Sequence, residues 1–135
     1  MEYKRKERGQ SLVEFVLILP VLLIILAGVL DLGRLYFAYV AVTDAAAEGV
    51  AYAAIPPEDE DNEIVNRAQD ASGGLIEIDR GLVGIECPDT ALGEPVTVTV
   101  SYNFIVITPF VNAMVSDGVL MLRAVDTEAI LAGEL

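Results

Sequence analysis

The side chains of this chain that could do chemistry are almost all carboxylates, hydroxyls and arginines. There is no His and one Cys, Cys87, which excludes a Ser-His-Asp triad, an imidazole metal site and an internal disulfide. Asp59 and Asp61 lack the Gly and Glu of an EF-hand loop, although weak calcium binding there stays an open alternative. Four acids could cluster around expected strands: Glu77, Asp79, Glu86 and Asp89. Since exposed acids beside strands usually serve solubility, we expect no enzyme activity, no cofactor and no metal site.

One carboxylate stands out by its position, because Glu14 lies at the start of an apolar run. Residues 15–30, between Glu14 and Asp31, carry no charge. A carboxylate in a membrane segment is costly and is a functional hypothesis by default. If the chain were cut after Gly9, the new α-amino group of Gln10 could pair with Glu14 of a neighbouring copy, since a low dielectric strengthens the attraction. The alternative is that Glu14 only marks the cytoplasmic edge of an ordinary span.

The charge of the chain is unevenly distributed along the sequence. The whole chain has a net charge of -13, from 21 acidic and 8 basic residues, yet 54% of its residues are hydrophobic. Residues 1–9 hold four of the basic residues and two of the acids, so removing them would change the net charge to -15. Because Lys and Arg stay on the cytoplasmic side, this leader is expected inside and the acidic body outside. Such an acidic chain repels phosphates, so nucleic-acid binding is excluded.

The apolar run and the residues after it predict one long helix. Residues 11–30 are enough to cross the hydrocarbon, which takes about 20 apolar residues. Asp31 and Arg34 would then form a charge pair at the outer membrane edge. Apolar positions continue at three- and four-residue steps, and we expect a continuous helix over residues 11–54, about 66 Å long. Pro56 follows it as a stop.

Three residues in the span or just beyond it would shape the helix and its contacts. Pro20 should kink or loosen it, which membrane helices tolerate. Gly28 and Gly33 would let neighbouring helices approach closely. A conventional secretory signal is the alternative interpretation, but the sequence Ala27-Gly28-Val29 is a poor cleavage site.

The rest of the chain predicts a short helix and a small sheet. Apolar and polar residues alternate from Val96 to Phe104, which is the clearest strand. Thr108-Pro109 is typical of a helix start and predicts a turn through Met114. The other expected elements are a helix at 63–71, a strand at 82–87 with 75–79 as a candidate partner, and a strand at 119–126. The fold class is α+β, with the long, partly transmembrane helix packed on an antiparallel sheet of three to four strands.

This organisation divides the chain into three parts. They are a basic leader (1–9), a transmembrane and protruding helix (10–54), and a small acidic extracytoplasmic α+β domain (55–135). The same organisation would suit a single-pass, membrane-anchored binding or assembly-factor module that is not incorporated into a filament and whose acidic domain binds a cationic partner. This stays the alternative reading of the function.

The sequence from Gly9 to Ala54 resembles a known family. Gly9 followed by QSLVEF resembles the class III prepilin-type signal, which is cut on the cytoplasmic side between Gly9 and Gln10, and an aromatic directly after the Glu is similar to the Flp/Tad branch. The whole stretch resembles the TadE-like family of pilus pseudopilins. Its further hallmarks are Pro20 after a Leu, the step Asp31, Gly33 and Arg34, and the tail Ala45, Ala46, Glu48, Gly49, Tyr52, Ala53 and Ala54.

The resemblance implies a pilin-like fold and a minor pilin or pseudopilin of a Tad (type IVc) pilus and secretion system, acting in pilus assembly and surface adhesion. It implies processing at Gly9 and Gln10, and signal recognition and subunit assembly by Glu14 and Phe15. The implied location is the cytoplasmic (inner) membrane or an extracellular pilus. Implied partners are other pilin or pseudopilin subunits, bound through the N-terminal helix, a prepilin peptidase, the Tad assembly platform and membrane lipid. Implied helix-packing residues are Pro20, Gly28, Gly33, Ala45, Ala46, Gly49 and Tyr52.

Overall fold

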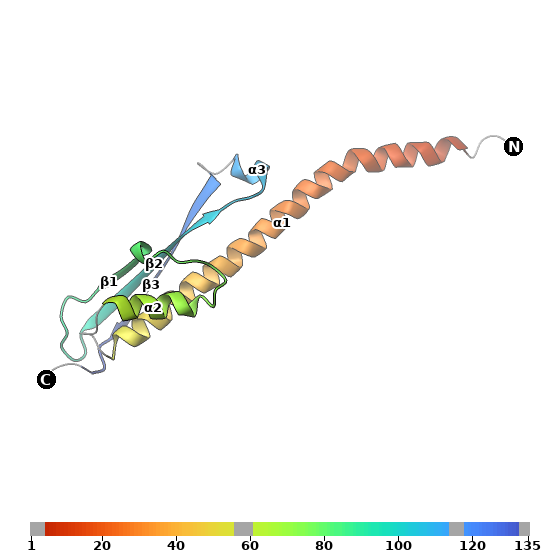
Figure 1. Ribbon diagram of the computed structural model, residues 1–135. Helices are drawn as coiled ribbons and strands as arrows, with labels where there is room; N and C mark the ends of the chain where they lie inside the picture. The colour runs from red at the N-terminus through yellow and green to blue at the C-terminus, as the bar shows by residue number, and fades with distance from the viewer. Residues whose placement is uncertain (1–4, 56–60, 114–117, 133–135) are drawn as a thin grey trace.

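One helix dominates the molecule and extends far beyond the rest of it (Figure 1). The computed structural model describes residues 5–55, 61–113 and 118–132. Helix α1 (Arg5–Ala53) has 49 residues and runs without interruption through Pro20. It bends gently within its N-terminal half (Figure 1), as a proline inside a helix favours. The expected long helix is confirmed, and it begins earlier than the apolar pattern indicated.

Downstream of α1 the chain forms a three-stranded antiparallel sheet with short helices around it. The elements are α2 (Asp61–Ala71), the 3-10 turn η1 (Arg80–Leu82), β1 (Val83–Glu86), β2 (Pro95–Ile105), α3 (Pro109–Asn112) and β3 (Val119–Ala129). The strand order is β1-β2-β3, so β2 is central and pairs with β3 along its whole length, from Pro95 with Ala129 to Ile105 with Val119. This confirms the α+β fold class. Asp59 and Met114 lie outside the described residues.

The strand considered at residues 75–79 does not form, and that part of the prediction is wrong. The C-terminal end of α2 satisfies the carbonyl groups of this segment instead. The Gln69 side-chain amide donates to the Ile78 carbonyl at 2.6 Å, and the Ser72 hydroxyl donates to the Ile76 carbonyl at 3.1 Å. The partner of β1 is β2, in the register Val83 with Val100.

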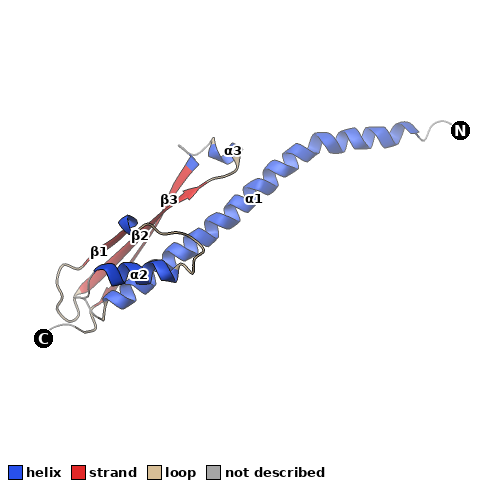
Figure 2. Cartoon of the chain, viewed as in Figure 1, coloured by secondary structure: helices blue, strands red, loops and turns tan. Residues whose placement is uncertain are grey.

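The core lies between the sheet and the C-terminal half of α1, with α2 closing one side (Figure 2). Val96, Val98 and Val100 are fully buried, whereas Thr97 and Thr99 between them are only partly buried, so the alternation expected for β2 is confirmed. These valines meet small residues of α1 and the apolar face of α2. The buried residues of those two helices are Val42, Ala45, Ala46, Val50, Ala53, Ile64 and Ala68.

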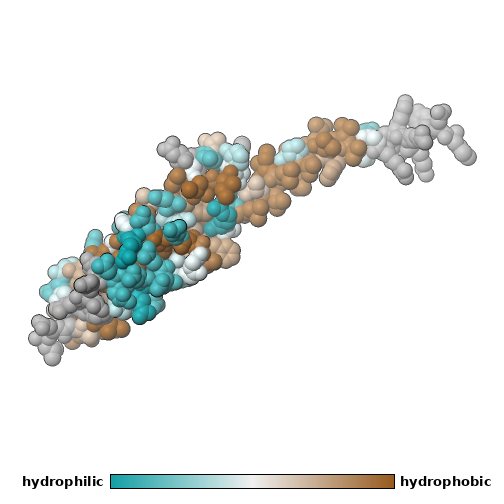
Figure 3. All heavy atoms as spheres, in the orientation of Figure 1, coloured by the Kyte–Doolittle hydropathy of each residue, from teal (hydrophilic) through white to brown (hydrophobic). Residues whose placement is uncertain are grey.

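The N-terminal half of α1 makes no such contacts. From Gly9 to Leu30 no side chain is buried, and within the candidate span the most apolar window has a mean hydropathy of 2.9 with none of it covered. Figure 3 shows this contrast as brown spheres along the protruding helix and teal spheres over much of the sheet domain. Among the described residues, α1 is the one helix long and apolar enough to cross a membrane.

Candidate functional site

The expected processing motif lies on an exposed stretch of α1. The amide nitrogen Nε2 of Gln10 donates to Oε1 of Glu14 at 3.1 Å, across one helical turn. Phe15 is 58% exposed, and the space around the position of a Cβ on Gly9 is open. In the intact chain, the carboxylate of Glu14 is thus accessible and has a donor from the residue that would become the new N-terminus. Processing at Gly9 and the roles of Glu14 and Phe15 stay predictions.

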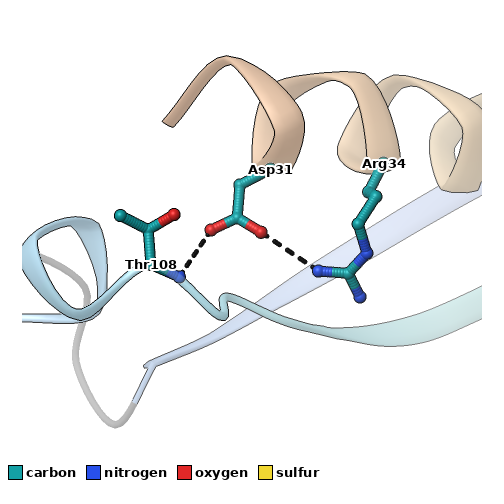
Figure 4. A network of polar contacts seen from close by, with 3 residues as sticks. All are labelled: Asp31, Arg34 and Thr108. Atoms are coloured by element: carbon teal, nitrogen blue, oxygen red, sulfur yellow. Dashed lines mark hydrogen bonds and ion pairs between the residues drawn. The ribbon is translucent and has the colours of Figure 1, made fainter. Parts of the chain in front are cut away.

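Asp31 and Arg34, expected as a charge pair, form a salt bridge and also attach the sheet to α1 (Figure 4). Asp31 is 8% exposed; its Oδ1 accepts from Nη1 of Arg34 at 3.0 Å and its Oδ2 accepts from the backbone N–H of Thr108 at 2.7 Å. The Arg34 guanidinium carbon lies 5.1 Å from the centre of the Phe104 ring on β2, a cation–π contact. Their place at a membrane edge stays a prediction.

Thr108 is the functional contact that sequence reasoning missed. It precedes Pro109 at the start of α3, as expected, but its side chain makes no capping hydrogen bond. Its backbone N–H instead reaches Asp31, 77 residues earlier in the chain. A buried acid was visible in the sequence only as a charge next to an apolar run, with nothing to indicate its partner.

The seven expected helix-packing residues separate into two groups. Ala45, Ala46 and Gly49 are buried against the sheet domain, and Tyr52 is partly buried with Arg67 stacked 5.1 Å from its ring centre. A Cβ on Gly49 would lie 3.2 Å from Cγ1 of Val98 and 3.4 Å from Cβ of Ala68, so the helix approaches β2 closely because Gly49 has no side chain.

The second group faces away from the sheet domain's core. Pro20 is exposed, and among the described residues no atom beyond the local helix backbone and the adjoining residues lies within 4 Å of a Cβ built on Gly28 or Gly33. Their packing against other subunits stays a prediction. The structure thus buries Ala45, Ala46 and Gly49 inside the molecule and leaves Pro20 and Gly33 exposed on its surface.

Two of the four acids considered for chemistry, Asp79 and Asp89, serve local structure. Asp79 accepts from the N–H of Gly81 at the start of η1, and Asp89 accepts from the N–H of Ala91. Cys87 is a partly buried free thiol whose Sγ lies 3.2 Å from the Asp89 carbonyl oxygen. Within the described ranges, no three His, Cys, Asp or Glu side chains come together as a metal site would need.

Comparison with known proteins gives a family match within helix α1. Residues 9–51 match a family model described as TadE-like protein. A search of the curated proteins and a search of the solved structures found no match. The matched segment contains the uncovered apolar half of α1, the Asp31–Arg34 pair and the buried small residues Ala45, Ala46 and Gly49, and it ends before α2. The match and the apolar helix fit, in general terms, a membrane-anchored pseudopilin related to the Tad pilus. The resemblance expected from the sequence is confirmed over this segment: residues 9–51 match the TadE-like family model.

Proposed function

We propose that this chain is a minor pilin or pseudopilin of a Tad pilus and secretion system, anchored by α1 and acting in pilus assembly and surface adhesion. The observation that supports the proposal most is the division of α1 within one TadE-like segment. Its inner half is apolar and uncovered, while its outer half is built into the core of the sheet domain. Such a helix can pack beside the helices of other subunits while it holds the domain outside.

The distribution of charge supports the orientation of the anchor. The leader, residues 1–9, holds half of the basic residues of the chain, and basic residues stay on the cytoplasmic side. The sheet domain, which carries most of the acids, then lies outside the cytoplasmic membrane. In this orientation the bond between Gly9 and Gln10 faces the cytoplasmic surface, where a prepilin peptidase would cut it.

Processing would change the surroundings of Glu14. In the intact chain, Glu14 accepts from the side chain of Gln10. A cut after Gly9 creates an α-amino group on Gln10, and its positive charge can attract the Glu14 carboxylate of an adjacent subunit in a medium of low dielectric. That pairing would favour one axial stagger between neighbouring helices. The assembly platform and other pilins are the partners of this step, and no catalytic group is needed in this chain.

The proposal is tested by the mass of the N-terminal peptide from membrane and filament fractions. The expected N-terminus is Gln10. A Gly9→Val variant should remain uncut, because the branched side chain would obstruct the close approach of the backbone to the peptidase cleft that Gly9 allows. The matched control is Gly33→Val, the same substitution on the same helix, which should be cut normally. An intact Met1 or a terminus other than Gln10 in the unmodified chain would contradict the proposal.

The same fractions distinguish a filament subunit from an anchored module that is not incorporated into a filament. Purified filaments labelled for this chain should carry the label along with the major subunit. A chain that is cut after Gly9 but stays wholly in the membrane fraction would favour the anchored module.

A further inference from the structure

The sequence at the end of the sheet next to α3 holds two uncharged stretches, one on each side of Asp117. We call residues 104–113 together with 118–122 the apolar tip. No charged residue occurs between Glu94 and Asp117, nor between Asp117 and Arg123, although the chain has 21 acids. Figure 3 shows apolar residues at this end of the sheet beside the apolar part of α1. The lack of charge is therefore local and belongs to one place in the fold.

The contact between Thr108 and Asp31 determines where the apolar tip lies along α1. Asp31 ends the uncharged run of residues 15–30, and its bond to the Thr108 N–H holds the tip beside that point. In Figure 1, α3 lies alongside α1, nearer to the N-terminus than the rest of the sheet domain. If residues 11–30 cross the hydrocarbon, the tip is at the outer surface of the bilayer.

A groove between α1 and the tip continues further toward the N-terminus. It has a volume of about 350 Å³, and its walls are apolar except for Asp31. Its α1 side includes Ile25 and Gly28, and its tip side includes Val111 and Leu120. Ile25 precedes Asp31 by six residues, which is about 9 Å along a helix. The groove therefore enters the part of α1 that would be surrounded by acyl chains.

The outward side chains of the tip are exposed aliphatic groups. Ile105 is 63% exposed, Ile107 66% and Met121 68%. On α1, Tyr36 and Phe37 are 67% and 65% exposed just beyond Asp31, and aromatic rings are favoured at a membrane interface. Aliphatic side chains gathered on one projecting end are unfavourable in water and favourable in lipid.

The backbone of the tip is also suited to a medium poor in water, where unpaired polar groups are costly. The N–H groups of Val106, Thr108, Asn112 and Ala113 each donate to an acceptor within the chain. Pro109 has no N–H to satisfy. The Asp31 carboxylate, which accepts from the Thr108 N–H, is paired with Arg34.

We propose that the apolar tip is a second membrane contact, which lies in the outer interfacial layer of the bilayer that α1 crosses, with lipid acyl chains entering the groove beside Gly28. The inference rests on the proposed anchoring by α1, because residues 11–30 set the level of the bilayer. Lipid is the occupant that the structure favours, since the tip is continuous with the uncovered apolar surface of α1 and lies at its outer end.

The natural chain has no Trp, so single Trp residues report depth without background. The full chain is reconstituted at low density in phosphatidylcholine vesicles, with and without bromine on the acyl chains. Ile107→Trp reports the tip, Ile18→Trp the proposed span and Leu92→Trp the opposite end of the sheet. Met121→Trp, at another exposed position of the tip, repeats the measurement if Ile107→Trp disturbs folding.

The expected result is that bromine quenches the Ile18→Trp and Ile107→Trp chains and leaves the Leu92→Trp chain bright. Quenching of Ile18→Trp, with Ile107→Trp and Met121→Trp as bright as Leu92→Trp, would overturn the tip contact while the anchor stands. No quenching of Ile18→Trp would overturn the anchoring and the tip contact with it. Quenching of the tip that disappears as protein density is raised would identify a second copy, rather than lipid, as the occupant.

Discussion

The Asp31 carboxylate on α1 accepts a 2.7 Å hydrogen bond from the backbone N–H of Thr108, which lies between β2 and α3. This bond joins the projecting end of the β2–β3 pair to the helix at a point well away from the main core. Both residues are buried, and Arg34 neutralises the carboxylate from the neighbouring turn. The bond from Thr108 to Asp31 therefore helps to hold this end of the sheet against α1.

Substitution of Asp31 should loosen the tip before it affects the rest of the fold. Asp31→Ala leaves the buried Thr108 N–H without an acceptor, so exchange of that amide hydrogen should quicken by about tenfold or more in the full chain in detergent. Asp31→Asn keeps a side-chain oxygen but loses the ion pair, so its Thr108 exchange rate should lie between those of the unmodified chain and Asp31→Ala. Asp44→Ala, an exposed acid on the same helix, is the control. Equal Thr108 exchange in all four chains would refute this role.

Enlarging Gly33 or Gly49, two of the glycines of α1, should have different effects. Gly49→Leu places a side chain where even a Cβ would lie 3.2 Å from Val98, so we expect a loss of unfolding free energy of about 1–3 kcal/mol. Gly33→Leu has open space and should leave folding unchanged. If Gly33 packs against neighbouring subunits, that variant should instead incorporate poorly into filaments. Thermal unfolding and filament content measure the two effects, and equal destabilisation by both would contradict the prediction.

The sheet domain should fail to fold without the outer half of α1. Val42, Ala46 and Val50 are at most 1% exposed and form the helix side of the core. A fragment of residues 55–135 loses them and leaves an apolar sheet face uncovered, whereas residues 31–135 keep them and also Asp31. Far-UV circular dichroism during heating should show a cooperative transition for the longer fragment only. A cooperative transition in the shorter one would favour the independent module.

Glu14→Ala should impair assembly more than processing. Cleavage needs the chain to enter the peptidase, whereas the proposed pairing with the Gln10 amine needs the carboxylate charge itself. Glu14→Gln keeps a hydrogen-bond acceptor without the charge and should behave like Glu14→Ala in assembly. The cut fraction is measured by mass and the assembled fraction by filament yield, with Glu48→Ala, an exposed acid of the outer half, as control. Normal filament yield from Glu14→Gln would exclude a role for the charge.

Sequence reasoning succeeded where a pattern is local. The alternation from Val96 to Phe104 predicts β2 because one face of that strand is covered and the other is not. The segment at 75–79 looked similar, but its Ile76 and Ile78 carbonyls accept from the side chains of Ser72 and Gln69, and no periodicity reveals such donors. The bond between Asp31 and Thr108 escaped for the same reason, since residues so far apart in the chain share no pattern.

The unbroken course of α1 has a mechanical consequence. The segment that would sit in the membrane and the segment on which the sheet is built are one helix, and no loop or hinge separates them. A pull along the helix axis would therefore move the sheet domain by the same distance and in the same direction. Withdrawal of the subunit from the bilayer would be a single rigid translation, resisted by the transfer of apolar side chains out of lipid and leaving the folded domain intact.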